Sequence, residues 1–145
     1  MGSMMMGDGS AAATTRAAAS WAAAVYDGGP GCIAEARRFA TGFLVDEHGL
    51  DPASDTVGAV QLIVSELVTN ACKFTSGPCA LDLERIASGV EVTVWDSGTA
   101  LPVVRAADPR RVGQHGLEIV LALCDGFAIE REPVGKRITV RVATS

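Results

Sequence analysis

The chain has 145 residues, of which 48% are hydrophobic, so its size and composition suit one domain with one packed core. Its formal net charge is −5 and it contains no basic run, which argues against nucleic acid as a direct partner. The apolar runs are too short to span a bilayer and the amino-terminus lacks a secretion signal, so we expect a cytoplasmic protein without a membrane segment.

Residues 1–18 are mainly Met, Gly, Ser, Ala and Thr, which predicts a disordered tail before a single domain over residues 19–145. Residues 20–26 favour a first strand, and the Gly- and Pro-rich residues 27–31 favour a turn. The cysteines show no CxxC spacing, which favours free, largely buried thiols over a zinc site or a disulfide framework; they are Cys32, Cys72, Cys79 and Cys124.

Helices and a hairpin follow the first turn. Apolar residues at helical spacing predict a helix from residue 32 to about residue 47, with Gly49 as its carboxy-terminal cap, and a second helix over residues 54–74. Alternating apolar and polar residues predict strands over residues 79–86 and 90–95, joined by a tight turn.

A loop, a third helix and a second strand pair are expected in the second half of the chain. Residues 97–113 lack periodicity, a helix is expected from Gly116, and residues 127–131 and 137–142 predict a second strand pair. The order of these elements predicts an α+β fold: a two-layer sandwich of a mixed, mostly antiparallel sheet with helices on one face.

The second helix carries a polar stripe. Glu66, Asn70 and Lys73 fall within roughly 60° of one another on a helical wheel. An amide oxygen suits Mg²⁺, a lysine meets phosphate oxygens, and a carboxylate can act as a base. The alternative is an ordinary surface helix. The stripe borders an apolar one formed by Val60, Ile63, Val64, Leu67, Ala71 and Phe74.

A carboxylate ends the clearest strand. Val90, Val92 and Val94 share one face, so Asp96 continues that face and points towards the helices. Burial of a carboxylate requires a donor. The exocyclic amine of adenine is one candidate, and the backbone amides of the following Ser-Gly turn are the alternative.

Two glycines precede the third helix. Gly113 and Gly116 stand just before Leu117, where free amides and the helix dipole can bind an anion such as phosphate. Roles as a hinge and a cap are the alternative. His115 lies between them and is either a phosphate contact or an exposed residue. Neither a GxxxxGK[ST] loop nor a GxGxxG fingerprint is present.

Taken in chain order, these segments resemble the motifs of the GHKL superfamily of ATPases, which includes histidine-kinase catalytic domains, gyrase-type ATPases and anti-sigma-factor kinases. Residues 66–75 (ELVTNACKFT) resemble the N box, residues 94–98 (VWDSG) the first glycine box, and residues 113–117 (GQHGL) the second. The resemblance covers roughly residues 20–143.

The resemblance implies a Bergerat-type ATP-binding fold with ATP and Mg²⁺ as ligands. Asn70 would ligate Mg²⁺, Glu66 would be the general base, and Lys73 would contact phosphate. Asp96 would accept a hydrogen bond from adenine, with Gly98 leaving room for the ring. Phosphates would lie against the second glycine box, at Gly113, Gly116 and the amide of Leu117, with His115 beside them.

In its short length, the chain is similar to the single-domain anti-sigma-factor serine/threonine kinases of bacteria. This likeness implies that it binds a sigma factor and phosphorylates an anti-sigma-factor antagonist, and a homodimer through the first strand and first helix is an option. Ala100 replaces a glycine of the first glycine box, which supports a second reading: a regulatory module that binds ATP without transferring phosphate. A third reading is an unrelated α+β enzyme that uses Cys72 and His115.

Overall fold

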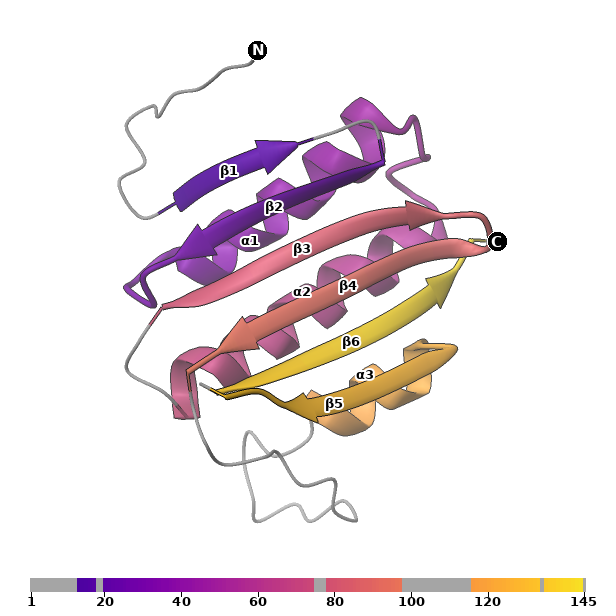
Figure 1. The fold of residues 1–145 in the computed structure, drawn as a ribbon. Coiled ribbons are helices and arrows are strands. Elements are labelled where there is room, and N and C mark those ends of the chain that lie inside the picture. Colours follow the sequence, from indigo (N-terminus) through magenta and orange to yellow (C-terminus); the bar gives the residue numbers. More distant parts are fainter. Residues whose placement is uncertain (1–12, 18–19, 75–77, 98–115, 134, 145) are drawn as a thin grey trace.

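The computed structural model describes residues 13–17, 20–74, 78–97, 116–133 and 135–144. These residues form two layers, with an antiparallel sheet in front and the helices packed behind it (Figure 1). The α+β two-layer sandwich with helices on one face, predicted from the order of the elements, is confirmed.

Six strands form the sheet in the order β1-β2-β3-β4-β6-β5. Every pairing between the described strands is antiparallel. The sequence predicted a mixed sheet, but the described part contains no parallel pair. Both predicted hairpins, β3–β4 and β5–β6, are present. The strands are β1 (Ala13–Ala17), β2 (Trp21–Tyr26), β3 (Cys79–Ile86), β4 (Gly89–Asp96), β5 (Gly126–Arg131) and β6 (Lys136–Ala143).

The edge strand β1 corrects one expectation. It pairs with β2 from Ala13 opposite Tyr26 to Ala17 opposite Ala22, so a disordered tail over residues 1–18 is wrong for this part of the chain. Backbone hydrogen bonds to a neighbouring strand require no apolar alternation, which is why composition alone did not reveal the strand. The preceding residues of the expected tail lie outside the described ones.

The first predicted helix has two parts. It is α-helical in α1 (Cys32–Thr41) and continues as a π-helix, η1 (Gly42–Glu47). Gly49 follows with a φ angle of 70°, the left-handed conformation expected of a glycine that ends a helix. Its backbone N–H donates to the carbonyl of Val45.

The second predicted helix is α2 (Asp55–Phe74), and the third is α3 (Gly116–Leu123). The hydroxyl of Ser54 accepts a hydrogen bond of 3.3 Å from the backbone N–H of Val57, so Ser54 caps the start of α2. No helix among the described residues combines the length and apolar character needed to cross a membrane.

The core lies between α2 and the sheet. The predicted apolar stripe of α2 is almost fully buried from Val60 to Ala71, and the inward residues of β3, β4 and β6 pack beneath it. On α3, Leu117 and Val120 are buried, whereas Leu121 is 40% exposed.

Candidate functional site

The ends of several elements meet at one end of the molecule (Figure 1). Cys79, at the start of β3, lies opposite Asp96, the last residue of β4. Asp96 also lies opposite Lys136, the first residue of β6. Because α2 ends at Phe74, shortly before β3, its carboxy-terminal turns reach the same end, and α3, which packs against α2, begins there.

The polar stripe of α2 runs towards this end. Glu66 and Asn70 are partly exposed, whereas Leu67 and Ala71 beside them are buried in the core. The structure assigns no hydrogen bond within its described residues to the side chain of either Glu66 or Asn70. Lys73 lies in the last turns of the same helix, but its side chain lies outside the described part of the structure.

Asp96 continues the inward face of β4, as predicted, and is buried. Its Oδ1 atom accepts a hydrogen bond of 2.9 Å from the Nζ atom of Lys136, and the two side chains are 3% and 2% exposed. Burying a charge is costly unless an opposite charge accompanies it. Lys136 therefore supplies Asp96 with a donor and a countercharge.

Lys136 was not among the candidate site residues. The sequence raised adenine and the turn amides as donors for Asp96, and it assigned no role to Lys136. The signal that reveals the pair is the register of β4 against β6, which sets Asp96 opposite Lys136. The two paired residues are 40 positions apart in the sequence, so the local spacing of residues does not reveal this register.

The turn before β6 approaches the end of β4 closely. Gly135 has a φ angle of 89°, and a Cβ atom placed on it would lie 1.8 Å from the backbone oxygen of Asp96. Any other residue would displace the end of β4 or the turn. Gly135 therefore fixes the position of the Asp96–Lys136 ion pair.

The glycine motifs are described only in part. Gly98, Ala100, Gly113 and His115 lie outside the described residues. Gly116 begins α3, and the side chain of the following residue, Leu117, is 5% exposed and faces the core. The described parts of all three motifs thus lie at the same end of the domain, while the remaining parts stay predictions.

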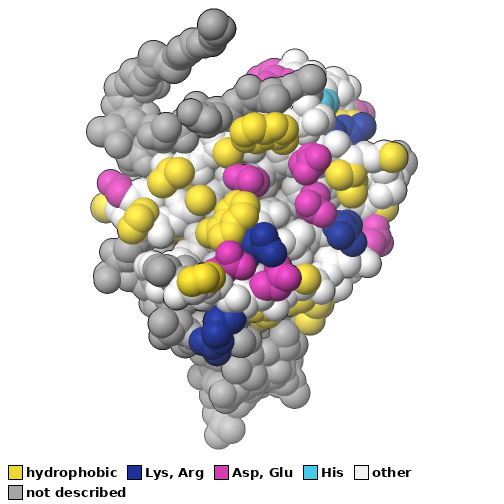
Figure 2. Space-filling view, in the orientation of Figure 1, with side chains coloured by type: hydrophobic (Ala, Val, Ile, Leu, Met, Phe, Trp, Pro, Cys, Tyr) yellow, Lys and Arg dark blue, Asp and Glu magenta, His cyan; other side chains and the backbone are white. Residues whose placement is uncertain are grey.

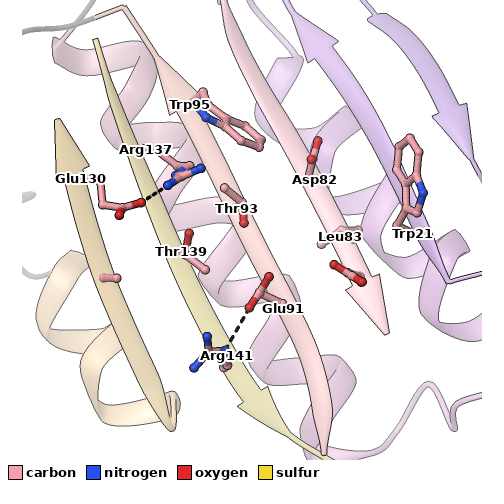
Figure 3. Close-up of a pocket in the computed structure, with 12 residues that line it drawn as sticks. Trp21, Asp82, Leu83, Glu91, Thr93, Trp95, Glu130, Arg137, Thr139 and Arg141 are labelled. Atoms are coloured by element: carbon pink, nitrogen blue, oxygen red, sulfur yellow. Dashed lines mark hydrogen bonds and ion pairs between the residues drawn. The ribbon is translucent and has the colours of Figure 1, made fainter. Parts of the chain in front are cut away.

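The opposite face of the sheet carries a separate depression (Figure 3). Trp21 and Trp95 line it together with charged residues, and none of the sequence-predicted site residues does so. Figure 2 shows acidic, basic and hydrophobic side chains intermixed over this face. Glu84 lies directly opposite Glu91, whose carboxylate pairs with Arg141 at 2.9 Å. This face is distinct from the end where the three motifs meet.

Comparison with known protein families agrees with the fold and the motif order. The family model described as "Histidine kinase-like ATPase domain" matches residues 11–142, which is most of the chain. The chain therefore belongs to the histidine kinase-like ATPase domain family. Comparison with curated proteins gives no match. Membership of this family indicates an ATP-binding domain.

Proposed function

We propose that the chain is an ATP-dependent serine/threonine protein kinase that acts as an anti-sigma factor in a partner switch. It binds a sigma factor and phosphorylates an anti-sigma-factor antagonist, in the bacterial cytoplasm where ATP is supplied. The observation that supports the proposal is that α2, which carries the partly exposed Glu66 and Asn70, ends at the same end of the domain as β4, whose last residue is the buried Asp96.

In this proposal the polar stripe of α2 serves the phosphate end of ATP. Asn70 supplies a neutral amide oxygen to Mg²⁺, and Lys73 neutralises phosphate oxygens. Glu66 is the general base: it removes the proton of the substrate hydroxyl as that oxygen forms a bond to the terminal phosphorus. The bond between this phosphorus and the bridging oxygen breaks, and ADP leaves.

In this proposal the end of β4 binds the adenine ring of ATP. Asp96 accepts a hydrogen bond from the exocyclic amine of adenine, and Gly98 leaves room for the ring. The Nζ atom of Lys136 donates to Oδ1 of Asp96 at 2.9 Å and so helps to orient this carboxylate. A carboxylate is a hydrogen-bond acceptor, so it selects a ligand that donates.

The second glycine box serves the phosphate chain. Gly113 and Gly116 allow close approach of the backbone, and the amide of Leu117 lies in the first turn of α3, where the helix dipole favours negative charge. His115, between the two glycines in the sequence, adds a further phosphate contact in this proposal. Buried Leu117 anchors this first turn to the core.

Calorimetry with ATP and Mg²⁺ tests the nucleotide site. Asn70→Ala should remove the magnesium-dependent part of ATP binding while the fold is retained. Glu66→Gln should keep ATP binding but abolish phosphate transfer. Thr69→Ala, a neighbouring change on α2, is the matched control. Normal Mg·ATP affinity in folded Asn70→Ala would rule out the assignment of the metal ligand.

A second candidate is a non-catalytic module that binds ATP and sequesters a protein partner. One observation favours it: Ala100 stands in the first glycine box. Labelled phosphate should then remain on ATP for wild type and Glu66→Gln alike, with equal partner binding. A homodimer is part of either proposal. The strand expected at its edge from the sequence, residues 20–26, is the inner strand β2, so the edge on that side of the sheet is β1.

A further inference from the structure

Three of the four thiols gather beside the proposed nucleotide site. The Sγ atoms of Cys32, at the start of α1, and Cys72, in the last turns of α2, are 3.4 Å apart. Cys79 lies near both of them, because their charges act on its thiol, and it pairs across the sheet with Asp96. All of these thiols are in the reduced form.

We propose that Cys32 and Cys72 form a reversible disulfide, which makes this pair an oxidative modification site between α1 and α2. A disulfide has an S–S distance of about 2.05 Å, so the two sulfur atoms must approach by roughly 1.4 Å. The pair also joins segments 40 residues apart, whose helices already pack against each other.

The exposure of the two residues sets the order of the reaction. Cys32 is 3% exposed, whereas Cys72 is partly exposed, so Cys72 meets the oxidant first. With a small-molecule disulfide such as oxidised glutathione, the Cys72 thiolate forms a mixed disulfide and releases one glutathione thiolate. Cys32 then attacks the Sγ atom of Cys72 and displaces the second. The two protein thiols lose two electrons and two protons, and one oxidised glutathione becomes two reduced molecules.

The surroundings of Cys72 and Cys79 favour the protonated thiol. Burial, the hydrogen bond with Cys32, and the charges of Cys32 and Asp27 raise the pKa of Cys72 to about 11. Burial and neighbouring charges also raise the pKa of Cys79, to about 12. Both groups are therefore neutral thiols in the reduced protein at neutral pH.

The effect on nucleotide binding rests on the proposed function. Cys72 lies two positions after Asn70 on α2, and Cys79 lies opposite Asp96. A disulfide would draw this part of α2 towards α1 and shift Asn70 relative to Asp96. We therefore expect the oxidised protein to bind Mg·ATP more weakly than the reduced protein.

The disulfide is tested on the full chain in glutathione buffers of increasing oxidising strength. Remaining thiols are alkylated and the digested protein is mapped by mass spectrometry. The expected product is a Cys32–Cys72 crosslink that reverts with dithiothreitol. Cys124→Ser should form it as wild type does, whereas Cys72→Ser should not, and Cys72→Ala replaces that variant if it fails to fold.

Different outcomes test the disulfide itself and its effect on Mg·ATP binding. Only mixed disulfides, only intermolecular disulfides, or a crosslink through Cys79 would overturn the proposed pair. Formation of the Cys32–Cys72 crosslink with equal Mg·ATP affinity before and after oxidation would overturn its coupling to the nucleotide site. Absence of ATP binding in both redox states would refute the proposed function and leave the disulfide result standing.

Discussion

Replacement of Lys136 by methionine is the sharpest test of the buried ion pair. Lys136 is 2% exposed and its Nζ atom lies 2.9 Å from Oδ1 of Asp96, itself 3% exposed. Methionine keeps the length and apolar character of the stem but removes the ammonium group. Asp96 then keeps a buried carboxylate that has lost its countercharge.

The expected cost follows from the loss of that countercharge. Removing one partner of a buried ion pair costs about 3–5 kcal/mol, because the other charge stays desolvated. Total stabilities of small domains are about 5–15 kcal/mol, so Lys136→Met should lower the urea midpoint markedly. The double variant Asp96→Asn with Lys136→Met removes both charges, and it should recover part of the loss.

Urea denaturation followed by tryptophan fluorescence measures these changes, since Trp95 adjoins Asp96. Arg137→Met is the matched control: it removes the next cation on β6, whose pairs with Glu130 and Glu132 lie at the surface. Its effect should be much smaller, since exposed ion pairs contribute little. If Lys136→Met costs no more than Arg137→Met, the ion pair does not hold the end of β4.

Three further predictions concern the sheet and core. Glu84→Lys should stabilise the protein by about 0.2–1 kcal/mol, because it replaces a like-charge pair with Glu91 by an opposite-charge pair; an unchanged urea midpoint would contradict this. Burial, and then the charge of Glu84, raises the pKa of Asp82 above its usual 3.8. The native state therefore holds this proton more tightly, and the stability contribution present at acid pH is lost as the pH rises through the raised pKa. Asp82→Asn should flatten that part of the stability–pH curve, and a curve identical to wild type would count against it. Leu67→Ala should cost about 2–5 kcal/mol in calorimetric unfolding, since the side chain is fully buried; a smaller loss would show that the core collapses around the gap.

The helices and strands of the core could be predicted because the apolar residues of each recur at a regular spacing. The apolar stripe of α2 repeats at helical spacing, and Val90, Val92 and Val94 alternate along β4. Both patterns reflect one buried face, so the sequence reveals the element and its orientation together. The inward direction of Asp96 followed from the same alternation.

Features that depend on partners distant in the chain left no such pattern. The strand β1 is fixed by its backbone pairing with β2, and its Ala-Thr composition carries no alternation. The Asp96–Lys136 pair depends on the register of β4 against β6, which local spacing does not encode. Likewise, Cys32 and Cys72 meet only because α1 packs against α2.

The residues of the candidate site also differ in whether the sequence could predict their positions. The spacing of Glu66 and Asn70 predicted a shared helical face, and both side chains lie partly exposed on α2. Gly98 and Gly113 belong to a segment whose chemistry depends on loop conformation, and they lie outside the described residues. Periodicity could not have positioned them, because a loop has none.

The buried ion pair bears on function as much as on stability. Desolvation of two charges offsets much of their attraction, and well-packed apolar residues at such positions are often as stable or more so. Val94 and Ile138, two residues along from Asp96 and Lys136 on the same strands, are apolar and equally buried, so the surroundings would accept an apolar pair. Stability alone therefore gives little reason for a carboxylate at the strand end. A ligand that donates a hydrogen bond to Asp96 would be a direct reason for the carboxylate. The buried carboxylate at the end of β4 therefore supports the proposed adenine site.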